Sequence, residues 1–148
     1  MKLIAAASLA LALAGCSPLP RNDQDAAAML VGKWYGEMPC SGDCGKRDYL
    51  RWTRVNFPDG AQRVHFRYYW KGAVSSNVVR TGRWGYEGGI YWLTCETFRV
   101  DGSPQSCPSA RYEFVVEAMT RERMTYWNER FRVRYRTVRV AEDFELKD

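Results

Sequence analysis

Few side chains in this sequence could carry out chemistry. His65 is the single histidine, and it stands between Arg63 and Arg67. Glu113 and Glu117 share one predicted strand, whose alternation directs both toward solvent. One histidine provides neither a multi-histidine zinc site nor a catalytic triad, and no Gly-x-Ser-x-Gly, phosphate-loop or His-Glu-x-x-His motif occurs. The sequence therefore predicts a protein that is not an enzyme and that needs no cofactor or metal.

The first fifteen residues differ from the rest of the chain. Residues 1–15 carry one charge, Lys2, which is followed by an uninterrupted run of apolar and small residues. This run is shorter than the roughly 20 residues that a membrane-spanning helix needs. A positive start before a short apolar run is typical of a secretory signal peptide. We therefore expect residues 1–15 to direct export and then to be removed.

The end of this segment, Leu13-Ala14-Gly15-Cys16, resembles the lipobox of bacterial lipoproteins; an ordinary signal peptide is the alternative. The resemblance implies a diacylglycerol on the Cys16 thiol and usually an acyl chain (palmitate) on its amino group, which together anchor a protein firmly. Ser17, rather than Asp, follows the cysteine, and in that family this usually permits transport to the outer membrane. The implied location is the outer membrane of the bacterial cell envelope, with the domain facing the periplasm or exposed at the surface. Residues 16–25 are expected to form the lipidated tether.

Four further cysteines, Cys40, Cys44, Cys95 and Cys107, could ligate zinc or form disulfides. Their spacing lacks the paired C-x2-C units of most zinc sites, and an even number in an exported chain favours two disulfides. Three pairings are possible. The short spacings favour Cys40–Cys44 and Cys95–Cys107, each of which would close a loop.

The composition indicates one folded domain, expected at residues 26–148. The 148 residues are 46% hydrophobic and 26% charged, with a net charge of +5, which excludes a disordered or low-complexity chain. Six Trp, nine Tyr and six Phe favour strands over helices. The exception is an alanine-rich segment, residues 26–30, which is expected to form about one helical turn capped by Asp25.

Apolar and polar residues alternate with a period of two along the chain. In residues 62–70, for example, Val64, Phe66, Tyr68 and Trp70 fall on one face, and the basic residues fall on the other. The predicted strands are residues 32–38, 49–56, 62–70, 77–85, 90–98, 111–117, 122–127 and 130–140. Eight short antiparallel strands favour an all-β, closed up-and-down barrel without exposed edges, and a two-sheet sandwich is the alternative.

The start of the first predicted strand, Gly32-Lys33-Trp34, resembles the Gly-x-Trp motif of lipocalins, including the helical turn before it. In that family the tryptophan plugs one end of an eight-stranded barrel and packs against an arginine from a late strand. The resemblance implies this role for Trp34 and for an arginine of the last predicted strand. The Thr-Asp-Tyr-like turn of lipocalins is not visible here, so the expectation is a minimal lipocalin-like (calycin-type) barrel.

Such a barrel can be filled by its own side chains or can hold one small ligand. If it is hollow, we expect Phe66, Tyr68, Trp84 and Trp92 to line its mouth and to bind an apolar, amphiphilic or anionic envelope molecule. If it is filled, these aromatic residues are core. The protein would then be a protein-interaction, assembly or inhibitor lipoprotein without a small-molecule ligand.

Four alternating arginines mark the last predicted strand: Arg130, Arg132, Arg134 and Arg136. Such a stripe would attract an anionic partner, for example a phospholipid headgroup, lipopolysaccharide or an acidic protein face. A solvated strand face is the alternative. The positive net charge is unfavourable for an inhibitor of basic enzymes. Export argues against nucleic acid as a partner, although basic and aromatic residues occur together.

Overall fold

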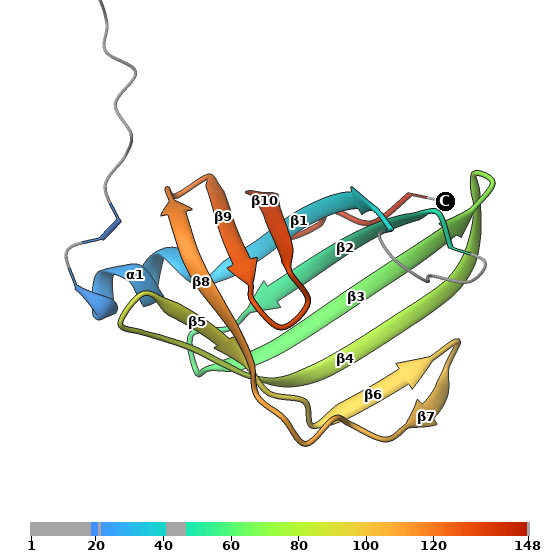
Figure 1. The fold of residues 1–148 in the computed structure, drawn as a ribbon, viewed down its shortest axis with the longest axis horizontal. Coiled ribbons are helices and arrows are strands. Elements are labelled where there is room, and N and C mark those ends of the chain that lie inside the picture. The colour runs from blue at the N-terminus through green and yellow to red at the C-terminus, as the bar shows by residue number, and fades with distance from the viewer. Residues whose placement is uncertain (1–18, 21, 41–46, 148) are drawn as a thin grey trace, which may run out of the picture.

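The computed structural model describes residues 19–20, 22–40 and 47–147. Cys16, Cys44 and the predicted signal peptide lie outside these ranges. Within them, one helix precedes ten strands (Figure 1): α1 (Asp23–Leu30), β1 (Gly32–Pro39), β2 (Tyr49–Asn56), β3 (Ala61–Trp70), β4 (Ala73–Glu87), β5 (Ile90–Leu93), β6 (Thr97–Val100), β7 (Ser103–Gln105), β8 (Tyr112–Met119), β9 (Arg123–Asn128) and β10 (Val133–Arg139).

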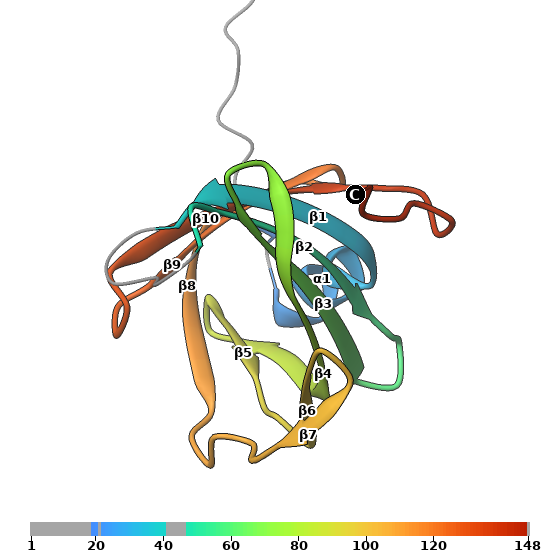
Figure 2. The ribbon, with the colours of Figure 1, turned by 90° about the vertical axis from the view of Figure 1, so that its right-hand side faces the viewer.

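Eight of these strands form a closed antiparallel barrel. Their order is β3-β2-β1-β10-β9-β8-β5-β4, and the pairing of β3 with β4 completes the ring. β6 and β7 form a hairpin that pairs only with β4. Figure 2 looks along the barrel, with α1 behind the strands at the far end. The predicted all-β, eight-stranded barrel is confirmed, and the sandwich alternative is wrong.

The strand predicted over residues 90–98 is in fact two strands, β5 and β6, because each pairs with a different half of the long strand β4. The chain passes over Gly82 between them. A Cβ at Gly82 would lie 2.1 Å from the Thr94 carbonyl oxygen, so only glycine allows the two backbones to approach so closely. Thr94 N and Glu96 N still donate to β4 carbonyls, each at 2.8 Å. This crossing turns β6 away from the barrel wall.

The last strand begins at Val133 rather than at residue 130. The prediction extended it because arginines and apolar residues continue to alternate through residues 129–132, which form a turn. The Asn128 side chain accepts a hydrogen bond from Phe131 N at 2.8 Å, and Arg132 has a positive φ of 54°. Asparagine side chains commonly organise turns in this way.

The helix is longer than predicted and has a different cap. It spans eight residues, and Asn22, not Asp25, is its N-cap: the Asn22 side chain accepts from Asp25 N at 2.8 Å. Ala26 and Leu30 are buried against the barrel. The apolar face of the helix therefore closes one end of the sheet.

Trp34 and Arg139 join this helix to the barrel, as the resemblance to lipocalins implied. Trp34 is fully buried, and the Arg139 guanidinium lies 4.5 Å from the centre of its ring. Arg139 also donates to Val31 O at 2.6 Å and to Met29 O at 2.5 Å. These carbonyls belong to the last turn and cap of α1, where the helix itself offers no donors. One arginine thus holds both the helix end and the tryptophan plug.

We predict that Arg139→Met lowers the free energy of unfolding by about 2–3 kcal/mol, because it leaves buried carbonyls without a charged donor. Urea unfolding monitored by tryptophan fluorescence would measure this. Arg99→Met, at an exposed position of β6, is the matched control and should change stability by less than about 0.5 kcal/mol. Equal effects of the two substitutions would contradict the role of Arg139.

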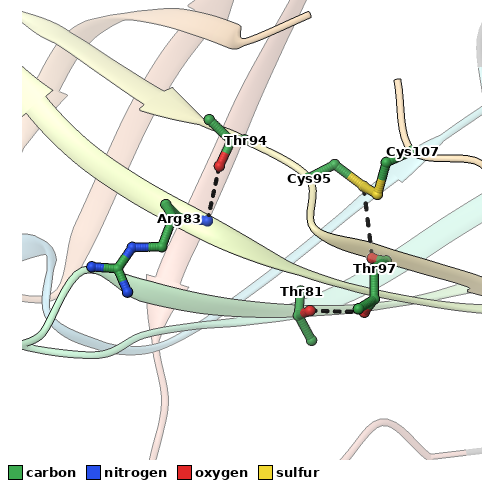
Figure 3. The surroundings of a disulfide bond; sticks show 6 residues. All are labelled: Thr81, Arg83, Thr94, Cys95, Thr97 and Cys107. Carbon is green, nitrogen blue, oxygen red and sulfur yellow. Dashed lines mark hydrogen bonds between the residues drawn. A yellow bond between two sulfur atoms is a disulfide. The ribbon is translucent and has the colours of Figure 1, made fainter. Parts of the chain in front are cut away.

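The predicted disulfide between Cys95 and Cys107 is present, with its Cα atoms 5.6 Å apart (Figure 3). It ties the β5–β6 crossing to the loop that follows β7. Thr81 Oγ1 and Thr97 Oγ1 lie 2.7 Å apart beside it, and Arg83 N donates to Thr94 Oγ1 at 3.0 Å. Cys40 is also disulfide-bonded, and its predicted partner lies outside the described residues.

We predict that the double variant Cys95→Ser/Cys107→Ser is less stable than the wild type by about 2–3 kcal/mol, as the closure of a short loop implies. Urea unfolding without reductant would measure the difference. In hydrogen exchange, amides of β6 and β7 should lose protection, whereas those of β9 and β10 should keep theirs. A uniform loss over all strands would show that the bond supports the whole barrel rather than its hairpin.

The segment after β10, residues 141–147, lies across the outer face of β1, β2 and β3. The Phe144 ring centre is 5.2 Å from that of Tyr35, and Leu146 is buried. Arg67 Nη1 donates to Leu146 O at 2.7 Å. The outer side chains of these strands are therefore covered in part by the chain end.

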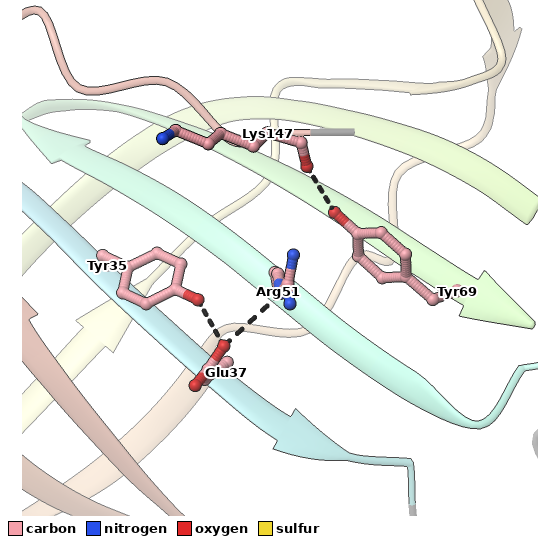
Figure 4. Close-up of polar contacts among 5 residues, drawn as sticks. All are labelled: Tyr35, Glu37, Arg51, Tyr69 and Lys147. Atoms are coloured by element: carbon pink, nitrogen blue, oxygen red, sulfur yellow. Dashed lines mark hydrogen bonds and ion pairs between the residues drawn. The ribbon is translucent and has the colours of Figure 1, made fainter. Parts of the chain in front are cut away.

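Figure 4 shows the polar contacts on this covered face. Tyr69 Oη donates to Lys147 O at 2.9 Å. The Tyr35 hydroxyl donates to the Glu37 carboxylate, which also lies 3.4 Å from Arg51 Nε. Burial and the contact with Glu37 raise the pKa of Tyr35 well above its ordinary value. These contacts join β1 to β2 on the outer face. The ion pair between Glu37 and Arg51 is exposed, so it adds little to the free energy of unfolding.

Candidate ligand-binding site

Two cavities occupy the end of the barrel opposite α1. The inner one has a volume of about 110 Å³ and is walled mainly by aromatic side chains of β2, β3, β8, β9 and β10. The outer one, of about 250 Å³, lies between β3, β4, β6 and the start of β8. Phe66, Arg80 and Tyr112 line both cavities. The inner cavity far exceeds the 10–15 Å³ or so needed for one water molecule, so this half of the barrel is not filled.

The other half of the barrel is filled with side chains. Its fully buried members include Trp34, Tyr91, Leu30, Met119 and Met124. The barrel is thus plugged at the helix end and hollow toward the β6–β7 hairpin. The expectation of a filled barrel therefore holds for the half next to α1, and the expectation of a hollow barrel holds for the half toward the β6–β7 hairpin.

The structure brings together two of the four predicted ligand-binding residues. Phe66 lines both cavities and Tyr68 lines the outer one. Trp84 lies in the core cluster of the filled half, where its Nε1 donates to Phe57 O at 2.9 Å. Trp92 lies on the opposite face of β5 from the buried Tyr91, under the Arg111 guanidinium at 4.8 Å. Neither tryptophan lines a cavity, because each lies outside the hollow half of the interior.

Two arginines that the sequence analysis did not single out face this interior. Arg54 is only 3% exposed and lines the inner cavity. Arg80 lines both cavities. The alternation contained a signal for them: Arg54 is in phase with Trp52 and Asn56, and Arg80 is in phase with Val78. A basic residue at a strand position whose neighbours in the alternation face the core is expected to place its charge inside the barrel.

Aromatic rings surround the Arg54 guanidinium. Its Cζ lies 4.6 Å from the centre of the Tyr91 ring and 5.1 Å from that of Tyr126, and its Nη1 donates to Tyr126 Oη at 3.1 Å. Contacts of a desolvated guanidinium with ring faces are worth about 2 kcal/mol. Burial lowers the pKa of Arg54, but Tyr126 and Tyr91 more than offset this, so the pKa lies above its ordinary value. Arg54 is a permanent cation inside the barrel.

Arg80 is the second interior cation. Its Cζ lies 4.9 Å from the centre of the Tyr112 ring and 5.7 Å from that of Phe66. Burial lowers the pKa of Arg80 below its ordinary value, and repulsion by Arg54 acts in the same direction. The two guanidinium groups are therefore close enough for each to sense the charge of the other.

Among the described residues, no carboxylate lines either cavity to balance these charges. Burial raises the pKa of Tyr135 to about 12 and also raises the pKa of Tyr91, so neither hydroxyl supplies a negative charge at physiological pH. Arg54 Nε, Arg54 Nη2 and Arg80 Nε have no hydrogen-bond partner among the described residues. Buried charges are normally paired, and among the described residues these two are paired with no carboxylate.

The predicted arginine stripe is divided by the structure. All four arginines are exposed, but Arg130 and Arg132 lie in the turn before β10, whereas Arg134 and Arg136 lie on its outer face. Arg134 Nε and Nη2 contact the Glu117 carboxylate at 2.6 and 2.9 Å. Arg134 is thus already paired, and the four side chains do not form one continuous row along a strand.

The residues weighed for catalysis do not meet. His65 lies on the outer face of β3, where its Nε2 is 3.3 Å from Asn77 Oδ1. Glu113 and Glu117 lie on the outer face of β8, each paired with an arginine. In the described part of the chain, no three His, Cys, Asp or Glu side chains cluster as metal ligands would. None of the described helical residues forms a helix long and apolar enough to cross a bilayer.

The chain matches no protein-family model, and no curated protein is similar to it at a significant level. The class that the fold and the cavities define is a small, closed, lipocalin-like β-barrel that is plugged at one end and open, with two interior cations, at the other.

We predict that His65 titrates with a pKa below 6.5. Burial lowers this pKa, and Arg67 and Arg63 lower it further, against the hydrogen bond with Asn77. At His65, the unfolded chain therefore binds the proton more tightly than the folded one. The contribution of neutral His65 to the free energy of unfolding is complete above about pH 6.5 and is lost as the pH falls below that value. NMR of the single histidine ring would measure the pKa directly.

His65→Gln is the control for this prediction. The difference in the free energy of unfolding between wild type and variant should shrink as the pH falls from about 7 to about 5. A difference that grows toward low pH would mean that the folded protein favours the imidazolium form, and the prediction would be wrong.

Proposed function

We propose that this chain is a lipid-anchored binding protein of the bacterial cell envelope that takes a small amphiphilic molecule into the open end of its barrel without transforming it. The observation that carries this proposal is the asymmetry of the interior. One end is plugged by α1 and Trp34, whereas the other holds two adjacent cavities that share three lining residues, the outer of which lies beside β6. A one-ended, aromatic-lined cavity suits a ligand that enters with one end first.

The size and lining of the cavities limit the ligand. Apolar and aromatic side chains dominate the outer cavity, with Val78, Phe98 and Val100 opposite Phe66. Both cavities are small beside the roughly 300–1,000 Å³ of typical drug-sized pockets. A slender chain fits this space better than a fused ring system, and the interior arginines favour a polar or anionic end group.

Two substitutions test whether ligands bind in the outer cavity: one places a large side chain in it, and the other places the same side chain elsewhere. We expect Val100→Trp, at the rim of the outer cavity, to weaken binding of decanoate and decan-1-ol at least tenfold in isothermal titration calorimetry. Val138→Trp, at an exposed position of β10, is the matched control and should bind as the wild type does. If the wild type binds neither probe, or if the two variants bind equally, small-molecule binding in the barrel is excluded.

The anchor is proposed from the Leu13–Cys16 motif, and a separate experiment tests it. In bacteria grown with an alkyne analogue of palmitate, the wild type should become labelled and should fractionate with the outer membrane. Cys16→Ser should remain unlabelled and leave that fraction. Labelling of the serine variant to the wild-type level would place the lipid elsewhere or show that the label is not specific.

A protein partner is a second candidate function, and one feature favours it. Phe131 is 50% exposed on the turn before β10, between Arg130 and Arg132. An exposed apolar side chain between two exposed arginines suits an acidic protein face or a lipid headgroup layer. This turn lies at the rim of the inner cavity, so a partner bound here would also cover the ligand site.

A further inference from the structure

Building on the proposed function, we propose that the ligand is a monocarboxylic acid with an unbranched apolar chain, and that it binds head first. Its carboxylate would lie against the free edge of Arg54, with the Arg80 guanidinium beside it, and its chain would extend toward the mouth at β6. The barrel would thus recognise the carboxylate of the ligand as well as the length of the ligand's apolar chain.

The first argument is which donors of Arg54 are free. Nη1 is taken by Tyr126 Oη, whereas Nε and Nη2 have no partner among the described residues. These two N–H groups point in parallel from one edge of the planar guanidinium and match the two oxygens of a carboxylate. The same protein shows this pairing at its surface, where Nε and Nη2 of Arg134 hold the two carboxylate oxygens of Glu117.

The second argument is charge. Arg54 and Arg80 both face the inner cavity, and no described side chain that lines it is acidic. Two cations that repel each other inside a protein are stabilised by an anion between them. A cationic or neutral head group would leave both charges unbalanced, so the site selects against it.

The third argument is direction. Arg54 lies in the inner cavity only, Arg80 lies where the two cavities meet, and the outer cavity is mainly apolar. An acid that enters with its head first therefore places its charge at the two arginines and its chain along Phe66, Val78 and Val100. The reverse orientation would bury the apolar chain end against the unpaired donors of Arg54. It would place the carboxylate in the outer cavity near Arg47, an exposed arginine whose guanidinium lies 4.4 Å from the centre of the Tyr68 ring.

The fourth argument favours a carboxylate over a phosphate. The buried donors without a partner among the described residues are the two-pronged edge of Arg54 and Arg80 Nε, and all of them belong to side chains. Phosphate sites usually add backbone N–H groups, often from a helix N-terminus. Here α1 directs its C-terminal carbonyls, not its N-terminus, toward the barrel, so it offers no donors to an anion.

The test compares three probes with the same ten-carbon chain. For wild-type protein freed of lipid, we expect decanoate to bind at least tenfold more tightly than decan-1-ol at pH 7.5, and decyl phosphate to bind more weakly than decanoate. Equal binding of acid and alcohol would overturn the head-group proposal and leave the proposed function intact. Tighter binding of decyl phosphate would assign the site to phosphate instead. Binding of none of the probes would mean that the proposed function itself fails.

Variants of Arg54 separate the effect of its two-pronged guanidinium edge from the effect of its positive charge. Arg54→Met should lose at least tenfold in affinity for decanoate while it keeps or gains affinity for decan-1-ol. A misfolded protein could not show this change of selectivity. Arg54→Lys keeps the charge without the two-pronged edge and should fall between wild type and Arg54→Met.

Arg123→Met is the matched control, because it removes the same charge at an exposed position of β9, and it should bind both probes as the wild type does. Arg80→Met should reduce decanoate affinity as well. Unchanged acid-over-alcohol selectivity in Arg54→Met would overturn the proposal.

Discussion

The contact of Arg139 with the end of α1 is the interaction on which the rest of the structure depends. Two carbonyls at the C-terminal end of the helix accept from this one guanidinium, and Leu30 O accepts from Trp34 Nε1 at 2.9 Å and Asn56 Nδ2 at 3.0 Å. A helix end buried without donors would be costly. Because these side chains supply the donors, the helix can lie against the barrel and close it. The helix and Trp34 then close this end of the interior, and the cavities lie toward the other end.

Polar groups are used differently at the two ends of the interior. Near the plug, Gln62 Nε2, Asn56 Oδ1 and Tyr91 Oη bond to one another at 2.7–3.2 Å, so that these three atoms are paired within the protein, although Gln62 Oε1 has no partner among the described residues. Farther along, Arg54 shares Tyr91 as a neighbour but keeps two free donors. A paired network rigidifies a core, whereas unpaired donors beside a cavity remain available. Tyr91 belongs to both regions: its hydroxyl is part of the paired network, and its ring contacts the Arg54 guanidinium.

The sequence predicted the barrel because it depends on alternation, which is local. It also predicted the role of Trp34 through a short motif, although Arg139 could not be chosen from the other arginines of the last strand. The strand over residues 90–98 was predicted as one, because the fact that β4 has two partners is visible only in three dimensions. Trp84 and Trp92 were assigned to the mouth from their aromatic character. The depth of Trp84 in the barrel depends on register along the axis, which alternation does not contain. Trp92 lies on the outer face of β5, out of phase with the buried Tyr91 and Leu93, so alternation within that strand could have excluded it. Arg54 was overlooked although its phase marked it.

The β6–β7 hairpin pairs with β4 alone and is tied back by the Cys95–Cys107 bond, so no strand of the ring needs it for closure. Insertions or deletions in this hairpin would reshape the wall opposite Phe66 without shifting any register around the ring. Arg54, in contrast, stands on β2, which pairs with ring strands on both sides, whereas Arg80 pairs with Val64 of β3 on one side and with Phe98 of the hairpin on the other. For the proposed ligand, changes in the hairpin would therefore alter the preference for tail length, while Arg54 would keep its place at the charged end.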